Sequence, residues 1–362
     1  KYVRQQGMVV AIVLDNIDQR DPDEQVRVFL LGHELSRAFD AIVVVALREE
    51  SYFRAHHAGA FNAYHNMRYH IASPDPLKVL KKRLGYTQRL VARGEEALQT
   101  RLKTSARFDT ENIRTILRLI RQSLANNPAV IKFMDAISDG NMRAALAMFN
   151  QFMVSGATHV RRMLDQVARG AGWTIAEHEF IKAVMLGDYQ FYRGSRSRIV
   201  NVFDISGSAR ASNLTVLRLL MFLRRRQGNS HPEGQGFVDI GEVSRAFEDT
   251  FGASDDLLFH MERLIRSRIL EADNRQVEGL VGVRHVRATA SGLYYEKTLA
   301  RRFQYLSHAC MDCPVWHGQT ESRIRAFANK TSLYDRTEQI EWFLAYLKLE
   351  ESRSIHRAPK RL

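Results

Sequence analysis

Polar and acidic side chains follow directly on an apolar run near the start of the chain. Residues 8–14 (MVVAIVL) are apolar, and Asp15, Asn16 and Asp18 come next. A short run rich in Val is typical of a buried parallel strand. A carboxylate at the end of such a strand can hold a magnesium ion bound to phosphate, because hard cations prefer oxygen ligands. The stretch favours Asp15 as that ligand, and a plain strand-end turn is the alternative, since Asp-Asn pairs also begin turns.

The residues that follow predict a parallel sheet. Residues 41–47 (AIVVVAL) form a second short apolar run. Between the two runs, apolar side chains recur at the spacing of a helix. Strand, helix and strand in this order make a βαβ unit, whose strands should be parallel and covered on both faces. We expect a second crossover next, with a helix over 48–68 and a short strand over 69–74.

The chain then becomes helical. From residue 76 to about 170, apolar side chains recur at three- and four-residue spacing, which predicts a bundle of four to six helices. Asp109 precedes one of these helices as a capping residue. Pro128 and the pair Asp139-Gly140 mark turns between helices.

The C-terminal part of the chain predicts a winged helix-turn-helix. Segments 169–173 (RGAGW) and 193–198 (RGSRSR) flank a connecting stretch. After it we expect a helix capped by Ser212 or Asn213, two further helices, a β-hairpin and a closing helix, the order of a winged helix. The expected helices are 212–226, 238–252, 254–270 and 292–308, the strands lie near 269–274 and 282–291, and a last amphipathic helix covers 336–352.

Arginines gather on the third of these helices and on the wing. Between residues 193 and 302 the chain has 18 Lys and Arg against 13 Asp and Glu. In a DNA-reading winged helix such side chains contact phosphates or base edges. A protein-interaction arm is the alternative, because acidic residues share the third helix. The residues expected to contact nucleic acid are Arg263, Arg266, Arg268, Arg284 and Arg287.

Composition bounds the class of protein. The 362 residues are 45% hydrophobic and 26% charged, the balance of folded domains and not of a disordered chain. A formal charge of +13 favours polyanionic partners such as nucleic acid. No apolar run is long enough to span a bilayer, so we expect no membrane partner. Two cysteines are too few for a disulfide framework, and we expect a cytoplasmic protein.

Together, the order of these parts resembles the C-terminal part of a P-loop ATPase of the AAA+ and STAND group, as in replication initiators and bacterial defence ATPases. The resemblance implies an α/β core fragment with a parallel αβα sheet, an all-α lid and a C-terminal winged helix. The implied domains are 1–76 for the core from Walker B to sensor 1, 77–170 for the lid with sensor 2, 171–210 for a connector, 211–308 for the winged helix, and 309–362 for a C-terminal helix and basic tail.

The resemblance also implies residues for a site that binds ATP and Mg²⁺. The stretch IVLDNID resembles a Walker B strand, in which Asp15 holds the metal. Asn16 stands where many members have a glutamate that orients the attacking water, and an amide cannot take a proton unless Asp18 substitutes. Arg48 matches the arginine that touches the γ-phosphate at the tip of the sensor 1 strand, and Arg143 matches sensor 2 on the lid.

A further implied role concerns a neighbouring subunit in a homo-oligomer. Arg68 occupies the usual place of an arginine finger, with Arg54 as a competitor. The chain has no G-x-x-x-x-G-K-[ST] loop, so that phosphate cradle must lie upstream of Lys1 or not exist. We therefore expect an ATP-dependent switch or remodelling ATPase linked to nucleic acid, with a role in replication initiation or phage defence. The alternative is a non-catalytic scaffold whose winged helix binds DNA or a partner protein.

Four soft ligands cluster after the expected winged helix. His308, Cys310, Cys313 and His317 lie close together in the sequence, and thiolates and imidazoles suit zinc. A complete structural site normally separates its ligand pairs by a longer loop. The sequence therefore favours a packing role at the end of a helix over a zinc site.

Overall fold

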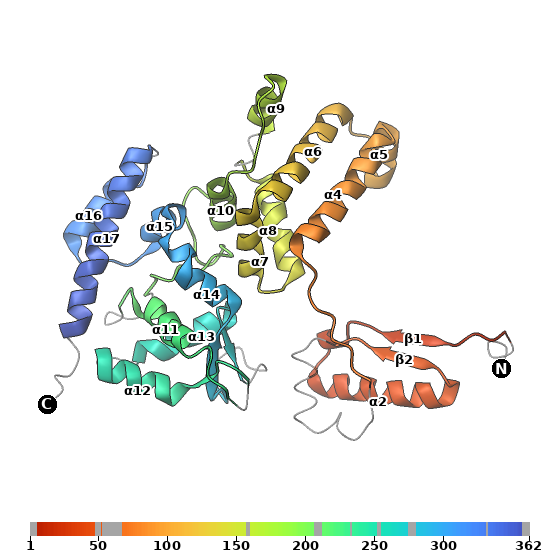
Figure 1. The fold of residues 1–362 in the computed structure, drawn as a ribbon, viewed down its shortest axis with the longest axis horizontal. Helices are drawn as coiled ribbons and strands as arrows, with labels where there is room; N and C mark the ends of the chain where they lie inside the picture. The colour runs from red at the N-terminus through yellow and green to blue at the C-terminus, as the bar shows by residue number, and fades with distance from the viewer. Residues whose placement is uncertain are drawn as a thin grey trace. The chain divides into compact units, whose positions relative to one another are not determined.

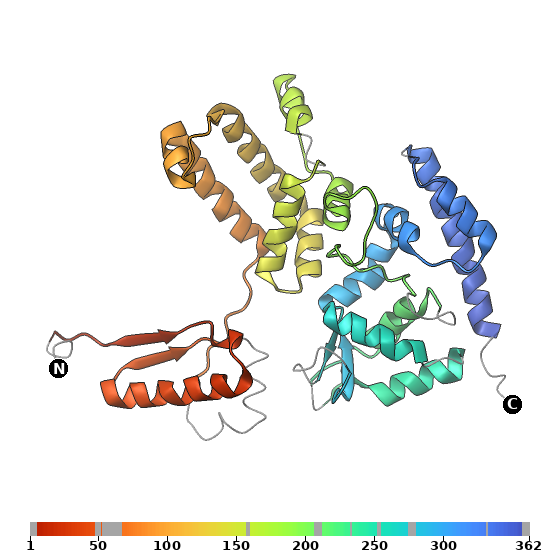
Figure 2. The ribbon, with the colours of Figure 1, turned by 180° about the vertical axis from the view of Figure 1, so that it is seen from behind.

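The computed structural model describes residues 6–47, 52, 67–156, 160–205, 212–231, 234–251, 255–273, 280–330 and 332–356. The chain forms two compact units (Figures 1 and 2). Unit 1 comprises Lys1–Ile71 with Asn274–Val277, and unit 2 comprises Ala72–Asp273 with Glu278–Leu362. Of the helices in the described part of the chain, none has both the length and the apolar composition needed to cross a lipid bilayer.

Unit 1 contains the predicted strand, helix and strand. Strands β1 (Ala11–Leu14) and β2 (Ile42–Val45) pair in parallel, and helix α2 (Pro22–Phe39) connects them. The helix begins where Asp21 caps it by accepting a hydrogen bond from Glu24 N at 2.9 Å, with a proline in the first turn. It ends at Asp40 in the left-handed conformation. The βαβ prediction and the parallel pairing are confirmed.

Only one face of this small sheet is covered within the described residues. Gly32 of α2 lies against the sheet, where an added Cβ would be 3.4 Å from side-chain atoms of Val43 and Val45. On the opposite face, Val13 is 64% exposed and Val44 47% exposed. The expectation that both faces are covered is therefore wrong for the described part of unit 1, although the apolar composition of the strands is that of a sheet with two covered faces.

The second crossover differs from the prediction. The expected helix over 48–68 falls mostly outside the described residues. The strand expected over 69–74 does not form, and Tyr69 and Ile71 are 82% and 90% exposed. Without apolar surface to cover these side chains, their β propensity alone does not order a strand.

Unit 2 begins with a bundle of helices, as predicted. Among the described residues of this region the helices are α4 (Pro76–Ala92), α5 (Glu95–Leu102), α6 (Thr110–Asn126), α7 (Pro128–Ser138), α8 (Met142–Val154) and α9 (Val160–Ala168). Asp109 caps α6, as predicted, by accepting a hydrogen bond from Asn112 N at 3.0 Å. Helix α7 begins at the predicted Pro128.

The core of the bundle extends into the stretch that was predicted to be a connector. Helix α10 (Glu177–Leu186) contributes Phe180, which is fully buried. Its ring lies 5.9 Å from that of Phe133 on α7 and 5.0 Å from that of Phe152 on α8, measured between centroids. Aromatic contacts of this kind add to the apolar burial that holds the helices together.

Three helices and a small antiparallel sheet follow. The elements are α11 (Thr215–Arg225), β3 (Val238–Asp239), α12 (Ile240–Phe251), α13 (Asp255–Arg266), β4 (Leu270–Ala272) and β5 (His285–Ala288), with strand order β3-β5-β4. The closing helix expected over 292–308 is divided at Thr298, whose backbone is not helical. The remaining elements are α14 (Ala290–Lys297), η3 (Leu299–Arg301), α15 (Phe303–Ala309), η4 (Cys310–Asp312), α16 (Gly318–Ala326) and α17 (Leu333–His356).

The segment 199–205, which includes a turn at 202–203, passes through the interior of unit 2. Buried tyrosine side chains make several of its backbone hydrogen bonds. Tyr305 Oη accepts a hydrogen bond from Val202 N at 2.8 Å and donates one to Val200 O at 2.7 Å. Tyr295 Oη accepts from Val200 N at 2.8 Å. The two tyrosines therefore satisfy polar backbone groups that no sheet or helix pairs.

The two residues expected to cap α11 differ in their roles. The N-cap position is Leu214, and Ser212 Oγ accepts a hydrogen bond from Leu214 N at 3.2 Å in the turn before the helix, whereas Asn213 does not cap it. Asn213 is instead buried, and its Nδ2 donates a hydrogen bond to Phe203 O at 2.7 Å. Its Oδ1 accepts one from Tyr346 Oη of α17 at 2.6 Å. Asn213 thus links segment 199–205 to the last helix.

Helix α14 approaches the sheet at a glycine. A Cβ added at Gly292 would overlap the carbonyl oxygen of Ile269 and lie 3.2 Å from Leu220 Cδ2. Thr289 caps the helix by accepting a hydrogen bond from Gly292 N at 3.1 Å. The absence of a side chain at Gly292 allows α14 to pack at this distance.

Candidate functional site

The acidic tip of β1 forms a compact turn. Asp15 is exposed, and its Oδ1 accepts a hydrogen bond from Asn16 N at 2.8 Å. Asn16 adopts the left-handed conformation, with φ 59° and ψ 25°, and Ile17 after it is 4% exposed. The side chain of Asp18 lies outside the described residues. One carboxylate oxygen of Asp15 therefore stabilises the turn, and the carboxylate remains at the surface, where it can reach a cation.

The tip of β2 leads to the predicted sensor arginine. Arg48 lies outside the described residues. Arg68, the predicted arginine finger, donates a hydrogen bond from Nη1 to Tyr52 Oη at 2.5 Å. Its guanidinium carbon is 5.5 Å from the centroid of the same ring. Arg68 is thus held by an aromatic side chain of its own unit.

The predicted sensor 2 arginine is at the first turn of α8. Arg143 is exposed and lies in unit 2, whereas Asp15 lies in unit 1. The turn before the helix is the predicted Asp139-Gly140 turn, where both residues have positive φ angles, 46° and 74°. Asn141 caps α8 by accepting a hydrogen bond from Ala144 N at 3.1 Å. The turn and the cap fix the start of the helix that presents Arg143 to solvent.

The arginines predicted on the third helix differ in their surroundings. Arg263 Nη1 is 2.6 Å from Asp204 Oδ2, and its Nη2 donates to Asn201 O at 3.4 Å. Arg263 therefore binds segment 199–205. Arg266 is exposed and pairs with Glu262 one turn earlier. Arg268 is exposed and adopts the left-handed conformation at the end of the helix, with φ 58°.

The two wing arginines differ in the same way. Arg284 is exposed, and its main chain is held by hydrogen bonds to Asp273 and Ile240. Arg287 Nη2 is 2.7 Å from Glu271 Oε2, and its guanidinium stacks over Phe237, 4.6 Å from the ring centroid. Arg287 and Arg263 thus bind within the fold, and Arg266, Arg268 and Arg284 are the exposed members of the predicted set. Sequence spacing could not indicate this division, because Asp204 is remote from Arg263 in the chain.

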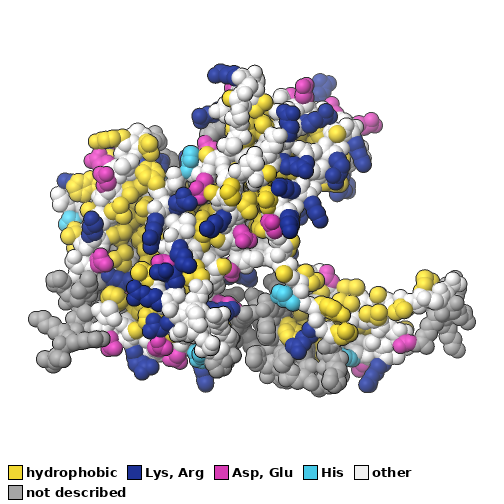
Figure 3. All heavy atoms as spheres, in the orientation of Figure 1, with side chains coloured by type: hydrophobic (Ala, Val, Ile, Leu, Met, Phe, Trp, Pro, Cys, Tyr) yellow, Lys and Arg dark blue, Asp and Glu magenta, His cyan; other side chains and the backbone are white. Residues whose placement is uncertain are grey.

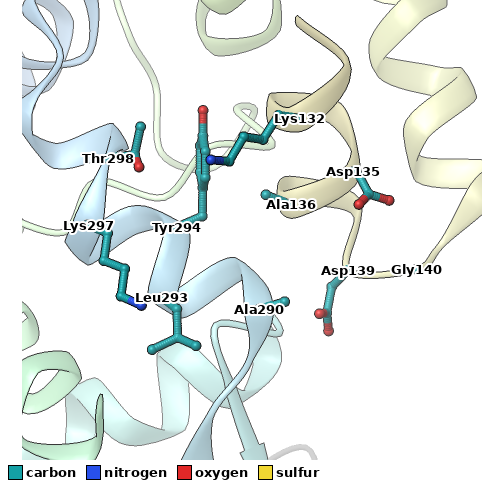
Figure 4. A pocket seen from close by; sticks show the side chains of 10 residues that line it. All are labelled: Lys132, Asp135, Ala136, Asp139, Gly140, Ala290, Leu293, Tyr294, Lys297 and Thr298. Atoms are coloured by element: carbon teal, nitrogen blue, oxygen red, sulfur yellow. The ribbon is translucent and has the colours of Figure 1, made fainter. Parts of the chain in front are cut away.

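A cavity that the sequence did not predict lies between α7 and α14. It has a volume of about 350 Å³ and contains none of the predicted site residues. Figure 4 shows Lys132 and Asp139 from the α7 side and Lys297 from α14 around it. Burial raises the pKa of Asp139, and the nearby charge of Glu271 acts in the same direction. Its lining residues come from two distant parts of the chain, so no local sequence pattern could identify it.

Three members of the cysteine and histidine cluster, His308, Cys310 and Cys313, are buried, and His317 is half-buried. Cys310 and Cys313 are buried, and burial raises the pKa of the Cys310 thiol to about 12. Cys313 Sγ donates a hydrogen bond to Phe203 O at 3.0 Å. Burial lowers the pKa of His308 to about 3, and His317 Nδ1 contacts Thr320 Oγ1 at 2.8 Å.

These contacts agree with the packing role that the sequence favours. In the described ranges of the chain, no three His, Cys, Asp or Glu side chains are grouped so that they could hold a metal ion. His308, Cys310 and Cys313 contribute to the interior near the end of α15, and His317 lies at the start of α16.

Comparison with protein-family models, with curated proteins and with solved structures gives no match. The functional interpretation therefore depends on the residues and geometry of the chain itself.

Proposed function

We propose that the chain is part of an ATP-dependent molecular switch of the AAA+ and STAND type that acts on nucleic acid. The observation that carries the proposal is the parallel register of β1 and β2, in which Leu14 pairs with Val45. Because the carboxyl ends of both strands lie at the same edge, Asp15 and the residues after β2 would flank a common nucleotide. This is the relation that a Walker B strand and a sensor 1 strand require.

The residues at that edge fit the expected ligand. An exposed carboxylate at a strand end suits Mg²⁺, which prefers oxygen donors and keeps several waters. Bound Mg²⁺ would neutralise charge on the transferred phosphate. Asp15 would hold the metal, Arg48 and Arg143 would bind the γ-phosphate, and Arg68 would reach a second copy in a homo-oligomer. Asn16 lacks a proton-accepting group, which suits a slow switch better than a fast motor.

The three-stranded sheet and its helices support the nucleic-acid part of the proposal. Helices α11, α12 and α13 precede the hairpin of β4 and β5, and β3 pairs with β5, which is the order of a winged helix. Arg266, Arg268 and Arg284 would contact phosphates. Arg263 and Arg287 would hold the domain together, since each already binds an acidic side chain.

The division into units suggests where such a switch would move. The helical bundle and the proposed winged helix belong to the same compact unit, and the boundary falls between Ile71 and Ala72. A ligand that binds two arrangements of a protein with different affinities shifts the equilibrium between them by the difference in its binding free energies. ATP would be such a ligand, and its γ-phosphate would set the position of the winged helix.

The test is ATP turnover by the intact protein with matched substitutions. We expect Asp15→Asn and Arg143→Ala each to lower turnover at least tenfold, or about 1.4 kcal/mol in the barrier. Asp23→Asn on α2 and Arg169→Ala after α9 are exposed controls on the same two units and should leave turnover unchanged. Equal turnover in all four variants and the parent would refute the assigned site.

A non-catalytic scaffold is the second candidate function. It is favoured by the hydrogen bond from Asn16 N to Asp15, because a strand-end turn needs this contact without any nucleotide. The scaffold would bind DNA or a partner protein with an affinity that ATP does not change. Equilibrium titration of the intact protein with Mg²⁺-ATP separates the two candidates: saturable binding that Asp15→Asn weakens supports the switch, and no binding supports the scaffold.

A further inference from the structure

The helical bundle of unit 2 has a large excess of basic over acidic residues. Residues 76–170 contain 17 Lys and Arg against 7 Asp and Glu, compared with 18 against 13 in the region of the proposed winged helix, 193–302. Figure 3 shows dark-blue Lys and Arg side chains gathered over α4, α5 and α6. The larger excess of positive charge therefore lies on helices for which the sequence indicated no nucleic-acid contact.

Exposed cations form a stripe on each of two packed helices. On α4 and its C-cap, four of the five exposed cations lie at positions i, i+4, i+11 and i+15, opposite the buried Leu80 and Leu84, and the fifth, Arg83, lies outside the stripe. On α6 the exposed cations lie at i, i+4 and i+7, opposite the buried Ile120 and Ser123. The seven residues, called the α4–α6 basic face from here on, are Lys78, Lys82, Arg89, Arg93, Arg114, Arg118 and Arg121.

The two stripes meet at a glycine. A Cβ added at Gly85 would lie 3.9 Å from Arg121 Nη1 and 4.0 Å from Arg89 Nη1. Both guanidinium groups therefore lie over the same residue, which has no side chain to separate them. Arg121 Nη1 donates to Gln88 Oε1 at 3.1 Å, a neutral partner that leaves its charge uncompensated.

Few acidic residues accompany this face: α4 contains none, and α6 contains one, Glu111, three residues before Arg114. Among the residues that the structure describes, no ion pair within 4.0 Å involves a Lys or Arg of α4 or α6. Like charges at i, i+4 spacing destabilise the helix that carries them by about 0.2 to 0.5 kcal/mol per pair. The fold retains this repulsion, and a bound polyanion would relieve it.

We infer that the α4–α6 basic face is a nucleic-acid-binding surface, separate from the proposed winged helix, that binds the phosphate backbone. The stripe from Lys78 to Arg93 spans about 22 Å at 1.5 Å per residue, the length of roughly six base pairs. Tyr86 lies among these cations and is 51% exposed, so it can stack on an unpaired base.

A lipid surface fits this face less well. A helix that lies on a membrane needs a broad apolar face with residues such as Trp, Phe and Leu. Tyr86 is the one large apolar side chain exposed on α4, and α6 exposes none within the described structure. The inference requires neither the nucleotide site nor the winged helix, because every contact it uses belongs to the bundle.

The test measures the affinity of the intact protein for a fluorescent duplex and for a single-stranded oligonucleotide over a salt series. Each phosphate contact contributes about −0.9 to the slope of log K against log salt for duplex DNA. We expect R114Q/R118Q/R121Q to reduce the slope by two to three units and to weaken binding at least tenfold near 0.1 M salt. The control R301Q/R325Q/K348Q removes the same charge from exposed positions on other elements and should change the affinity less than twofold.

Further measurements exclude unfolding and other partners. The variant R114K/R118K/R121K keeps the charge and should keep the salt slope. At low salt, R114Q/R118Q/R121Q should melt at a temperature no lower than the parent, because it removes repulsion. A slope equal to that of the control would overturn the inference. If R114Q/R118Q/R121Q loses binding to vesicles with 30% phosphatidylserine but binds nucleic acid as the parent does, the face would be assigned to a membrane instead. ATP turnover should stay at the parent level, so failure here is distinguishable from failure of the nucleotide site.

Discussion

Removing one buried hydroxyl tests whether segment 199–205 is held by tyrosines. Tyr305 is fully buried, and burial raises its pKa well above the ordinary value, so the hydroxyl stays protonated and can donate. In Tyr305→Phe, both Val202 N and Val200 O lose their partner. Each unsatisfied buried backbone group costs about 1 to 3 kcal/mol, so we expect the two together to lower the free energy of unfolding by about 2 to 6 kcal/mol.

Two other tyrosines calibrate this loss. Tyr295→Phe removes one hydrogen bond, from Val200 N, and should cost about half as much, roughly 1 to 3 kcal/mol. Tyr86→Phe is the exposed control and should lie within about 0.5 kcal/mol of the parent. The assay is urea denaturation followed by circular dichroism, with the midpoint compared at constant m-value. If Tyr305→Phe is no less stable than Tyr86→Phe, the proposed support of segment 199–205 is refuted.

Three further predictions concern backbone geometry and pH. Gly292→Ala should destabilise by about 1 to 3 kcal/mol through overlap with a main-chain carbonyl, whereas Gly85→Ala, with no atom closer than 3.9 Å, should gain about 0.5 to 1 kcal/mol in a thermal melt. Burial lowers the pKa of His308 to about 3 and of His260 to about 4. The unfolded chain binds a proton on each of these histidines below about pH 6.5, whereas the folded chain does not until the pH reaches its lower folded-state pKa. The free energy of unfolding is therefore highest above about pH 6.5 and falls as the pH falls, by about 2 kcal/mol per histidine at pH 5. Urea titrations from pH 7 to pH 5 should show this fall, reduced in His308→Gln; equal pH dependence in the variant and the parent would contradict the assignment to His308. Asn16→Gly should be as stable as the parent in a thermal melt, and Asn16→Val should be less stable by about 1 to 2 kcal/mol, because residue 16 has a positive φ angle. If Asn16→Val is as stable as Asn16→Gly, the left-handed turn is contradicted.

Features of the fold that depend on local signals could be predicted from the sequence. The apolar runs before Asp15 and Arg48 indicated two strands, and the helical spacing between them required a parallel pair. Asp109 was a correct cap, because capping involves only the next few residues. The strand expected at 69–74 failed, since a strand needs neighbouring surface that propensity does not supply.

Features that depend on distant partners could not be predicted. Asn213 resembled a helix cap, yet its partners are Phe203 and Tyr346, and only the packed chain brings these together. Arg263 resembled a DNA contact until the fold paired it with Asp204. The α4–α6 basic face is a different case. Its spacing is visible in the sequence, but its significance depends on the close packing of the two helices and on the lack of acidic partners within the described structure.

The burial of segment 199–205 determines how the chain can be divided for experiments. A recombinant fragment that begins after this segment would lack the backbone groups that Tyr295 and Tyr305 bind, and the two buried hydroxyls would lose these hydrogen-bond partners. A fragment that stops before α17 would remove the partner of Asn213. Expression trials should therefore cut near Ala72 and keep everything from there through the last helix on one polypeptide.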